Sequence, residues 1–264
     1  MACTGGRVPV PRRNGCWGAS CHRRGDATCA SPGAEYTPIG GDKIYRKIAY
    51  GPLLDLFVLD TRSHRGPNSA GRDKTYGPGA SWLGPVQRDW LKQGLSRSRA
   101  AWKIVACDMP LGIASADGKE AWDNACNGNG EAMGRELEIA DVLAHLQHEG
   151  VRDVAWVTAD LHYAAATRYE PSRAQFKDFD PFWEFLAGPL HAGTFNPNAL
   201  DDTFGPRCER VSLSERIAGA NPPSDGMQWY GIVEIDAKSR ALTVAFHDGH
   251  GREVHRMTVE PSSG

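Results

Sequence analysis

The chain has 264 residues, enough for one large domain, or one and a half, with a substantial buried core. Its composition, 41% hydrophobic and 23% charged, is typical of a globular protein, and its 30 glycines and 17 prolines favour a loop-rich fold over a helical bundle. The formal net charge of -2 gives no reason to expect nucleic acid or an anionic membrane as a partner. No apolar run reaches the ~18 residues that would predict a transmembrane helix.

The first 34 residues differ from the rest of the chain. They are rich in Gly, Pro, Arg and Cys and show no hydrophobic periodicity, so we expect a disordered leader or a segment foreign to the protein. The segment lacks the apolar centre of a secretory signal, and no apolar run follows either of its arginine pairs. Cys16, Cys21, His22 and Cys29 leave a zinc-binding leader open as an alternative, although their spacing fits no ordinary structural zinc site.

Strands and helices are predicted to alternate from residue 44 onward. The predicted elements are strands over 44–50 and 53–59, a helix that begins at Pro85, a strand over 102–107, a loop over 108–131, a helix over 136–148 and a strand over 154–157. Pro85 suits the first turn of a helix, and Gly150 suits the stop of the second helix. This order is typical of a layered α/β fold.

The last third of the chain has a different pattern. Residues 175–195 are dense in aromatic side chains, which we interpret as a loop-and-turn subdomain packed over the sheet, with a cofactor-binding segment as the alternative. Residues 228–235, 241–247 and 253–259 predict a β-meander with turns at 236–240 and 248–251.

Three aspartates follow three apolar strands. Asp60, Asp108 and Asp160 each come directly after a predicted strand, and open α/β sheets usually hold ligands at the carboxyl ends of their strands. His162 lies two residues beyond Asp160, so a carboxylate and an imidazole can reach the same side of the sheet and suit a metal ion. The alternative is that each aspartate serves its strand-end turn, beside an ordinary half-buried histidine.

The order and spacing of several segments resemble the PhoD-like (alkaline phosphatase D) family of metallophosphoesterases. The segments that carry the resemblance are 44–47, 51–65 (GPLLDLFVLDTRSHR), 83–91 (LGPVQRDWL), 98–103, 158–163 (TADLHY) and 178–185 (DFDPFWEF). Over residues 35–261 the resemblance implies a layered α/β metallophosphoesterase-like sheet with flanking helices and the C-terminal β-meander. It also implies a secreted or periplasmic hydrolase of phosphate monoesters and diesters that depends on metal ions, calcium and iron.

The resemblance also implies roles for particular residues. The family's Gly-Asp-x-His motif is matched by 159–162 with Ala159 in place of Gly, so Asp160 and His162 inherit the role of metal ligands. Asp108, Arg62 and the Trp122-Asp123 pair are weaker candidates for catalysis or for shaping the pocket. Arg62, with Arg65, either faces phosphate or pairs structurally with Asp55, Asp60 or backbone carbonyls.

Family members carry a longer region before the point where this chain begins to match. We therefore expect a truncated member: residues 1–34 as a leader outside the family, and residues 35–261 as the C-terminal portion of the fold. A sheet without its other half would expose an edge and an apolar face, which favours self-association. The alternative function is a non-catalytic remnant or binding module that keeps this portion of the fold.

Overall fold

The structure is a computed structural model that describes residues 35–36, 43–113, 124–213, 217, 219 and 221–262. The predicted leader over 1–34, with the cysteines and histidine of the zinc alternative, lies outside these residues, as does the Trp122-Asp123 pair. Among the residues that are described, no helix has both the length and the apolar character needed to cross a membrane.

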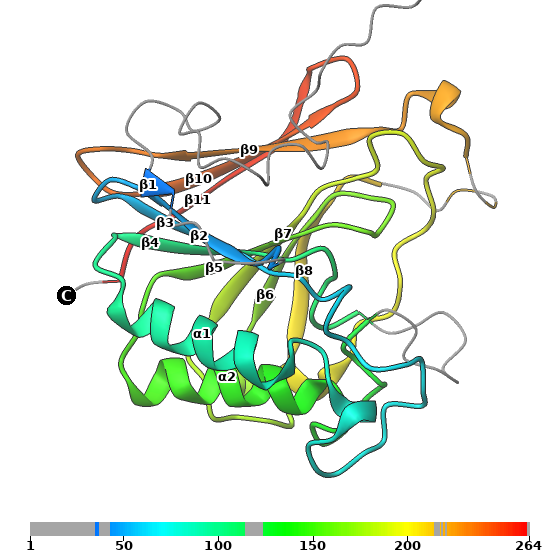
Figure 1. Ribbon diagram of the computed structural model, residues 1–264. Coiled ribbons are helices and arrows are strands. Elements are labelled where there is room, and N and C mark those ends of the chain that lie inside the picture. Colours follow the sequence, from blue (N-terminus) through cyan, green and yellow to red (C-terminus); the bar gives the residue numbers. More distant parts are fainter. Residues whose placement is uncertain are drawn as a thin grey trace, which may run out of the picture.

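An eight-stranded mixed sheet forms the centre of the molecule (Figure 1). Its strands, in spatial order, are β1 (Glu35–Tyr36), β2 (Arg46–Tyr50), β3 (Leu54–Val58), β4 (Trp102–Ala106), β5 (Val154–Thr158), β7 (Phe182–Leu186), β6 (Ala165–Tyr169) and β8 (Pro206–Val211). The four central strands β3, β4, β5 and β7 are parallel to one another, and the outer pairings are antiparallel. The parallel strands therefore bring their carboxyl ends to one edge of the sheet.

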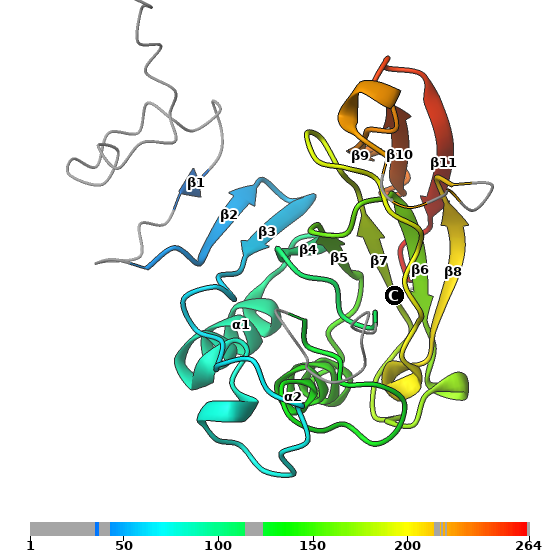
Figure 2. The same cartoon turned by 90° about the vertical axis from the view of Figure 1, so that its right-hand side faces the viewer.

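Two helices cover one face of this sheet and a smaller sheet covers the other (Figures 1 and 2). The helices are α1 (Gly84–Arg97) and α2 (Glu136–His148), and the smaller sheet consists of β9 (Trp229–Ile235), β10 (Leu242–Asp248) and β11 (Glu253–Val259). Within the described residues, four short 3-10 helices lie in the connections: η3 (Pro78–Ala80), η4 (Pro171–Arg173), η5 (Asp202–Phe204) and η6 (Pro223–Asp225).

Alternate residues of the central strands enter two separate cores. In β4, Val105 packs into the cluster beneath the helices, while Ile104 packs into the cluster shared with β9–β11. In β5, Trp156 packs into the cluster beneath the helices and Ala155 into the cluster shared with β9–β11. Successive side chains of a strand point to opposite faces, so a nearly continuous apolar strand is the pattern of a sheet that is covered on both sides.

The amino end of α1 is capped by a carboxylate from α2. Glu138 Oε2 accepts hydrogen bonds from the backbone N–H groups of Trp82 at 3.0 Å, Leu83 at 2.6 Å and Gly84 at 3.1 Å. The first N–H groups of a helix have no partner within it and carry partial positive charge, so a buried carboxylate stabilises them. This contact ties the two helices together where α1 begins.

Two expectations from the sequence were wrong. The aromatic segment 175–195 is not only a subdomain over the sheet, because β7 lies within it and pairs with both β5 and β6. The apolar face that we expected to be exposed is packed for β4, β5 and β7, whose residues share a cluster with Trp229, Leu242 and Phe246 of the smaller sheet.

Candidate functional site

The candidate site lies at the edge where the central parallel strands end. The ladder continues past the strands, with Leu59 N donating to Ala106 O at 2.9 Å and Cys107 N donating to Val157 O at 3.0 Å. The three aspartates that the sequence singled out therefore follow three adjacent strands, β3, β4 and β5, at the same edge.

Asp60 and Asp108 play different parts at this edge. Asp60 is buried, and its carboxylate accepts a hydrogen bond from Ser63 N at 2.9 Å, so it holds the turn after β3. Asp108 is exposed, and Oδ1 of its carboxylate accepts a hydrogen bond of 2.5 Å from the hydroxyl of fully buried Thr61. The turn after β3 thus orients the carboxylate that follows β4.

Asp160 is held in an unusual backbone conformation. Its φ is 69°, in the left-handed region that a non-glycine residue rarely adopts. Leu161 N donates to Ala159 O at 2.9 Å, which closes a tight three-residue turn with Asp160 at its centre. Such strained conformations are found preferentially at functional sites, and this turn leaves the Asp160 side chain exposed at the end of β5.

His162 is oriented by the loop that follows β7. Its Nδ1 hydrogen-bonds the carbonyl oxygen of Gly193, and its ring lies 4.9 Å from that of Phe195, centroid to centroid. A carbonyl oxygen can only accept, so Nδ1 carries a hydrogen, and in the neutral imidazole Nε2 keeps its lone pair. A histidine held in this way through Nδ1 has the arrangement of a metal ligand that coordinates through Nε2.

The described residues fit part of a metal centre only. His162 has the required hydrogen-bonding arrangement, and Asp160 supplies a carboxylate two residues away. However, no group of three or more His, Cys, Asp or Glu side chains that could hold a metal ion occurs among the residues that the structure describes. Asp60, Asp108 and Asp160 therefore share an edge without forming the cation site that we expected from three strand-end carboxylates.

The remaining candidates are placed as follows. Arg62 is exposed, and Arg65 donates to Asn68 Oδ1 at 2.7 Å. The carboxylate of Asp55 pairs with Lys47 at 2.7 Å. Cys107, beside Asp108, is buried, and burial raises the pKa of its thiol well above the ordinary value, so it does not supply a thiolate nucleophile.

A buried polar network, which was not predicted from the sequence, lies beneath this edge. Glu184 of β7 accepts hydrogen bonds from Thr158 Oγ1 at 2.8 Å, from Leu111 N at 3.0 Å and from the hydroxyl of Tyr169. Burial raises the pKa of Glu184, and these three donors act against that rise. The signal in the sequence was a lone carboxylate within the apolar run Phe182-Trp183-Glu184-Phe185-Leu186.

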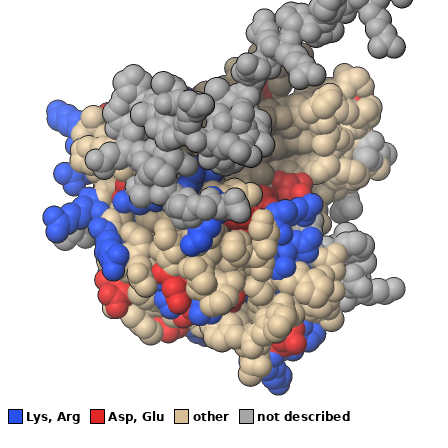
Figure 3. Space-filling view, in the orientation of Figure 1, with Lys and Arg blue, Asp and Glu red and all other residues tan. Residues whose placement is uncertain are grey.

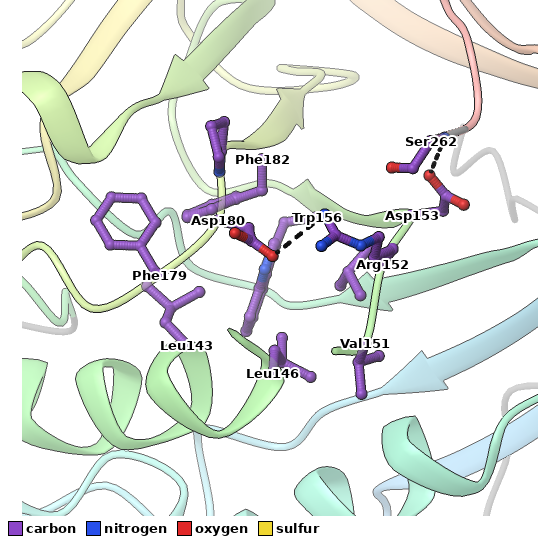
Figure 4. Close-up of a pocket in the computed structure, with 12 residues that line it drawn as sticks. Leu143, Leu146, Val151, Arg152, Asp153, Trp156, Phe179, Asp180, Phe182 and Ser262 are labelled. Atoms are coloured by element: carbon purple, nitrogen blue, oxygen red, sulfur yellow. Dashed lines mark hydrogen bonds and ion pairs between the residues drawn. The ribbon is translucent and has the colours of Figure 1, made fainter. Parts of the chain in front are cut away.

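A cavity of about 270 Å³ lies at the opposite edge of the sheet (Figure 4). It is lined by Leu143 and Leu146 of α2 and by Trp156, with Arg152 and Asp180 paired at 3.6 Å across it. It contains none of the candidate site residues, since it opens where β5 and β7 begin. On the face of the molecule that is seen in Figure 3, basic and acidic side chains are interspersed.

The chain belongs to the PhoD-like phosphatase family, whose family model matches residues 27–246. Alkaline phosphatase D of Bacillus subtilis (strain 168) is 26% identical in an alignment over 144 residues that covers 49% of this chain and 23% of that protein. A solved structure of PhoD aligns with 86% of this chain and 46% of its own chain, at 18% identity and a TM-score of 0.45. The matched region is less than half the length of either relative.

Proposed function

We propose that this chain is a metal-dependent phosphoesterase that hydrolyses phosphate monoesters and diesters, with its site at the carboxyl edge of β3, β4 and β5. Membership of the PhoD-like phosphatase family supports the reaction class. The observation that carries the proposal is the arrangement of His162, whose Nδ1 is engaged by Gly193 O while Asp160 sits in a strained turn beside it. We assign residues 35–261 to the phosphatase domain and expect the enzyme to act outside the cytoplasm.

Asp160 and His162 are the proposed metal ligands, and calcium and iron the proposed metals. When bound, such ions would polarise the phosphoryl oxygens and lower the pKa of a bound water. The other ligands would have to come from outside the described residues, because the described ones supply no larger group. Asp108, held by Thr61, is a candidate to orient water or accept a proton, and exposed Arg62 is a candidate to contact phosphate.

The test compares the wild-type chain with Asp160→Asn and with a matched control, Asp178→Asn, supplied with calcium and iron. Asp178 is a half-buried aspartate that pairs with His148 at 3.0 Å, at the opposite edge of the sheet. Hydrolysis of p-nitrophenyl phosphate and of bis-p-nitrophenyl phosphate at alkaline pH is expected to fall by more than about 100-fold in Asp160→Asn, because a ligand is lost. Asp178→Asn is expected to keep wild-type turnover.

Metal content gives a second readout for the same variants. We expect Asp160→Asn and His162→Gln to bind less metal per chain than wild type, as measured by elemental analysis after gel filtration. A folded wild-type chain that binds metal through these residues but hydrolyses neither ester would contradict the proposed enzyme and favour a binding module. A chain that binds no metal and hydrolyses neither ester would contradict the proposal altogether.

A further inference from the structure

Glu184 is a fully buried carboxylate at the centre of the sheet. It is the third residue of β7, it is 1% exposed, and it lies opposite Trp156 of β5 and Thr167 of β6. A carboxylate withdrawn from water is costly unless its oxygens are hydrogen-bonded. The neighbouring strands and the loop after β4 supply those hydrogen bonds.

The partners of Glu184 come from three different elements. Thr158 is the last residue of β5, Tyr169 is the last residue of β6, and Leu111 belongs to the loop that leaves β4. The hydroxyl of Tyr169 also accepts a hydrogen bond from Gly112 N at 2.9 Å. Glu184 and Tyr169 therefore satisfy two successive backbone N–H groups of one loop.

The loop approaches Tyr169 so closely that only glycine fits at position 112. A Cβ built on Gly112 would lie 2.8 Å from Cε1 and 2.9 Å from the hydroxyl oxygen of Tyr169. Contacts this short are not observed for real Cβ atoms, so the loop is packed down onto the buried tyrosine. Because it has no side chain, Gly112 can come close enough for its own N–H to donate to the Tyr169 hydroxyl.

Two of the three hydrogen bonds to Glu184 come from residues close in sequence to a candidate site residue. Thr158 precedes Asp160 by two residues, and Leu111 follows Asp108 by three. Buried and fully hydrogen-bonded side chains lock the backbone segments that they join. The carboxylate of Glu184 therefore fixes the residues after Asp108 relative to the residues before Asp160. In addition, Thr61, in the turn after β3, donates a hydrogen bond to the carboxylate of Asp108 itself.

We propose that Glu184 is a positioning residue, which through Thr158 and the Leu111–Gly112 loop holds Asp108 in register with the Asp160–His162 segment. This role rests on the proposed phosphoesterase function. Glu184 itself, enclosed beneath the edge, does not touch substrate. Loss of its hydrogen bonds leaves the ligand side chains in place but loosens the two segments that carry them.

The test uses Glu184→Leu and Tyr169→Phe in the full chain, with Leu146→Ala as a control. Thr158 and Leu111 both donate to Oε1 of Glu184, so leucine, which is of similar size, removes the acceptor of both hydrogen bonds, and phenylalanine removes only the hydroxyl of Tyr169. Leu146 is a buried residue of α2 at the opposite edge, so its truncation lowers stability without touching the loop. The thermal midpoint of each variant is measured first, and activities are then compared at temperatures where all the proteins are folded to the same extent.

Two readouts separate positioning from simple stability. Amide exchange of Leu111 and Gly112 is expected to rise by at least about tenfold in both Glu184→Leu and Tyr169→Phe, because local opening becomes easier. Under conditions where each protein is equally folded, kcat on p-nitrophenyl phosphate is expected to fall by about tenfold or more with KM changed less than about twofold. Leu146→Ala is expected to change neither.

One contrary result is that the wild-type chain hydrolyses the ester while the kcat values of the Glu184 and Tyr169 variants stay as high as that of Leu146→Ala. That result would overturn the positioning role and leave the proposed function standing. Unchanged exchange at Leu111 and Gly112 would also overturn it. A folded wild-type chain without turnover would overturn the proposed function, and this role with it.

Discussion

Glu136 illustrates how one buried residue makes the stability of the protein depend on pH. Its carboxyl is fully buried, accepts hydrogen bonds from Asn127 and Met133, and faces the carboxyl of Asp201. Burial, and after it the charge of Asp201, raises the pKa of Glu136 to about 9. The folded protein therefore keeps a proton that the unfolded chain gives up near pH 4.5.

This shift predicts lower stability at alkaline pH. A raised pKa contributes stability that is complete below the unfolded value and is lost as pH rises towards about 9. The free energy of unfolding is expected to fall between pH 6 and pH 9 by up to about 1.4 kcal/mol per unit. Urea titrations at several pH values should show a flatter profile for Glu136→Gln, and equal slopes for the two proteins would contradict this assignment.

Helix α1 contains a glycine where helix propensity alone would favour alanine. Gly94 begins the last turn of the helix, and a Cβ there would be 2.7 Å from Cε1 of Phe57 in β3. The phenylalanine ring is fully buried between the sheet and α1, so it cannot move away. The close approach of helix and sheet therefore outweighs the entropic cost of glycine.

We predict that Gly94→Ala destabilises the protein by about 1–3 kcal/mol, although alanine is the better helix former by roughly 1 kcal/mol. Chemical denaturation measures the change. Gln93→Ala, at an exposed position one residue earlier, is the control and is expected to be neutral within about 0.5 kcal/mol. A Gly94→Ala variant that is more stable than wild type would contradict this prediction and show that the Phe57 ring can shift to make room for the added Cβ.

At the level of elements, local pattern was a good guide wherever one face of a segment is apolar. Helix α2 spans Glu136–His148 as predicted, with Gly150 at a φ of 65° just beyond its end, because helical spacing and a glycine stop are local signals. The prediction failed at β7, where aromatic residues crowd both faces. Strand and buried loop cannot be told apart there by periodicity.

The whole molecule is held together by two cores on opposite faces of one sheet. The smaller sheet β9–β11 contributes Leu242, Val244 and Phe246 to the second core, against Ile104 and Phe185 of the large sheet. A three-stranded antiparallel sheet is stable chiefly when its apolar face is packed. The meander therefore depends on the large sheet.

We predict that Phe246→Ala releases the meander before the rest of the fold. Phe246 is 2% exposed, and truncation of such a residue costs about 3–5 kcal/mol. Limited proteolysis with peptide mapping should show earlier cleavage between β9 and β11, while amides of β4 and β5 stay protected. Thr243→Ala, at a half-buried position on β10, is the control. Simultaneous cleavage of both sheets would mean that the two cores unfold as one unit.

Sequence by itself determined the layered α/β class, most element positions, the family, and the residues that follow the ends of the parallel strands, because these depend on local periodicity and on short motifs such as Ala159-Asp160-Leu161-His162. Only the tertiary structure decided which partners those residues have. Gly193 O for His162, Thr61 for Asp108, and the three donors around Glu184 come from segments between 15 and 73 residues away. Hydrogen bonds over such separations follow from strand order and loop packing, which no local pattern specifies.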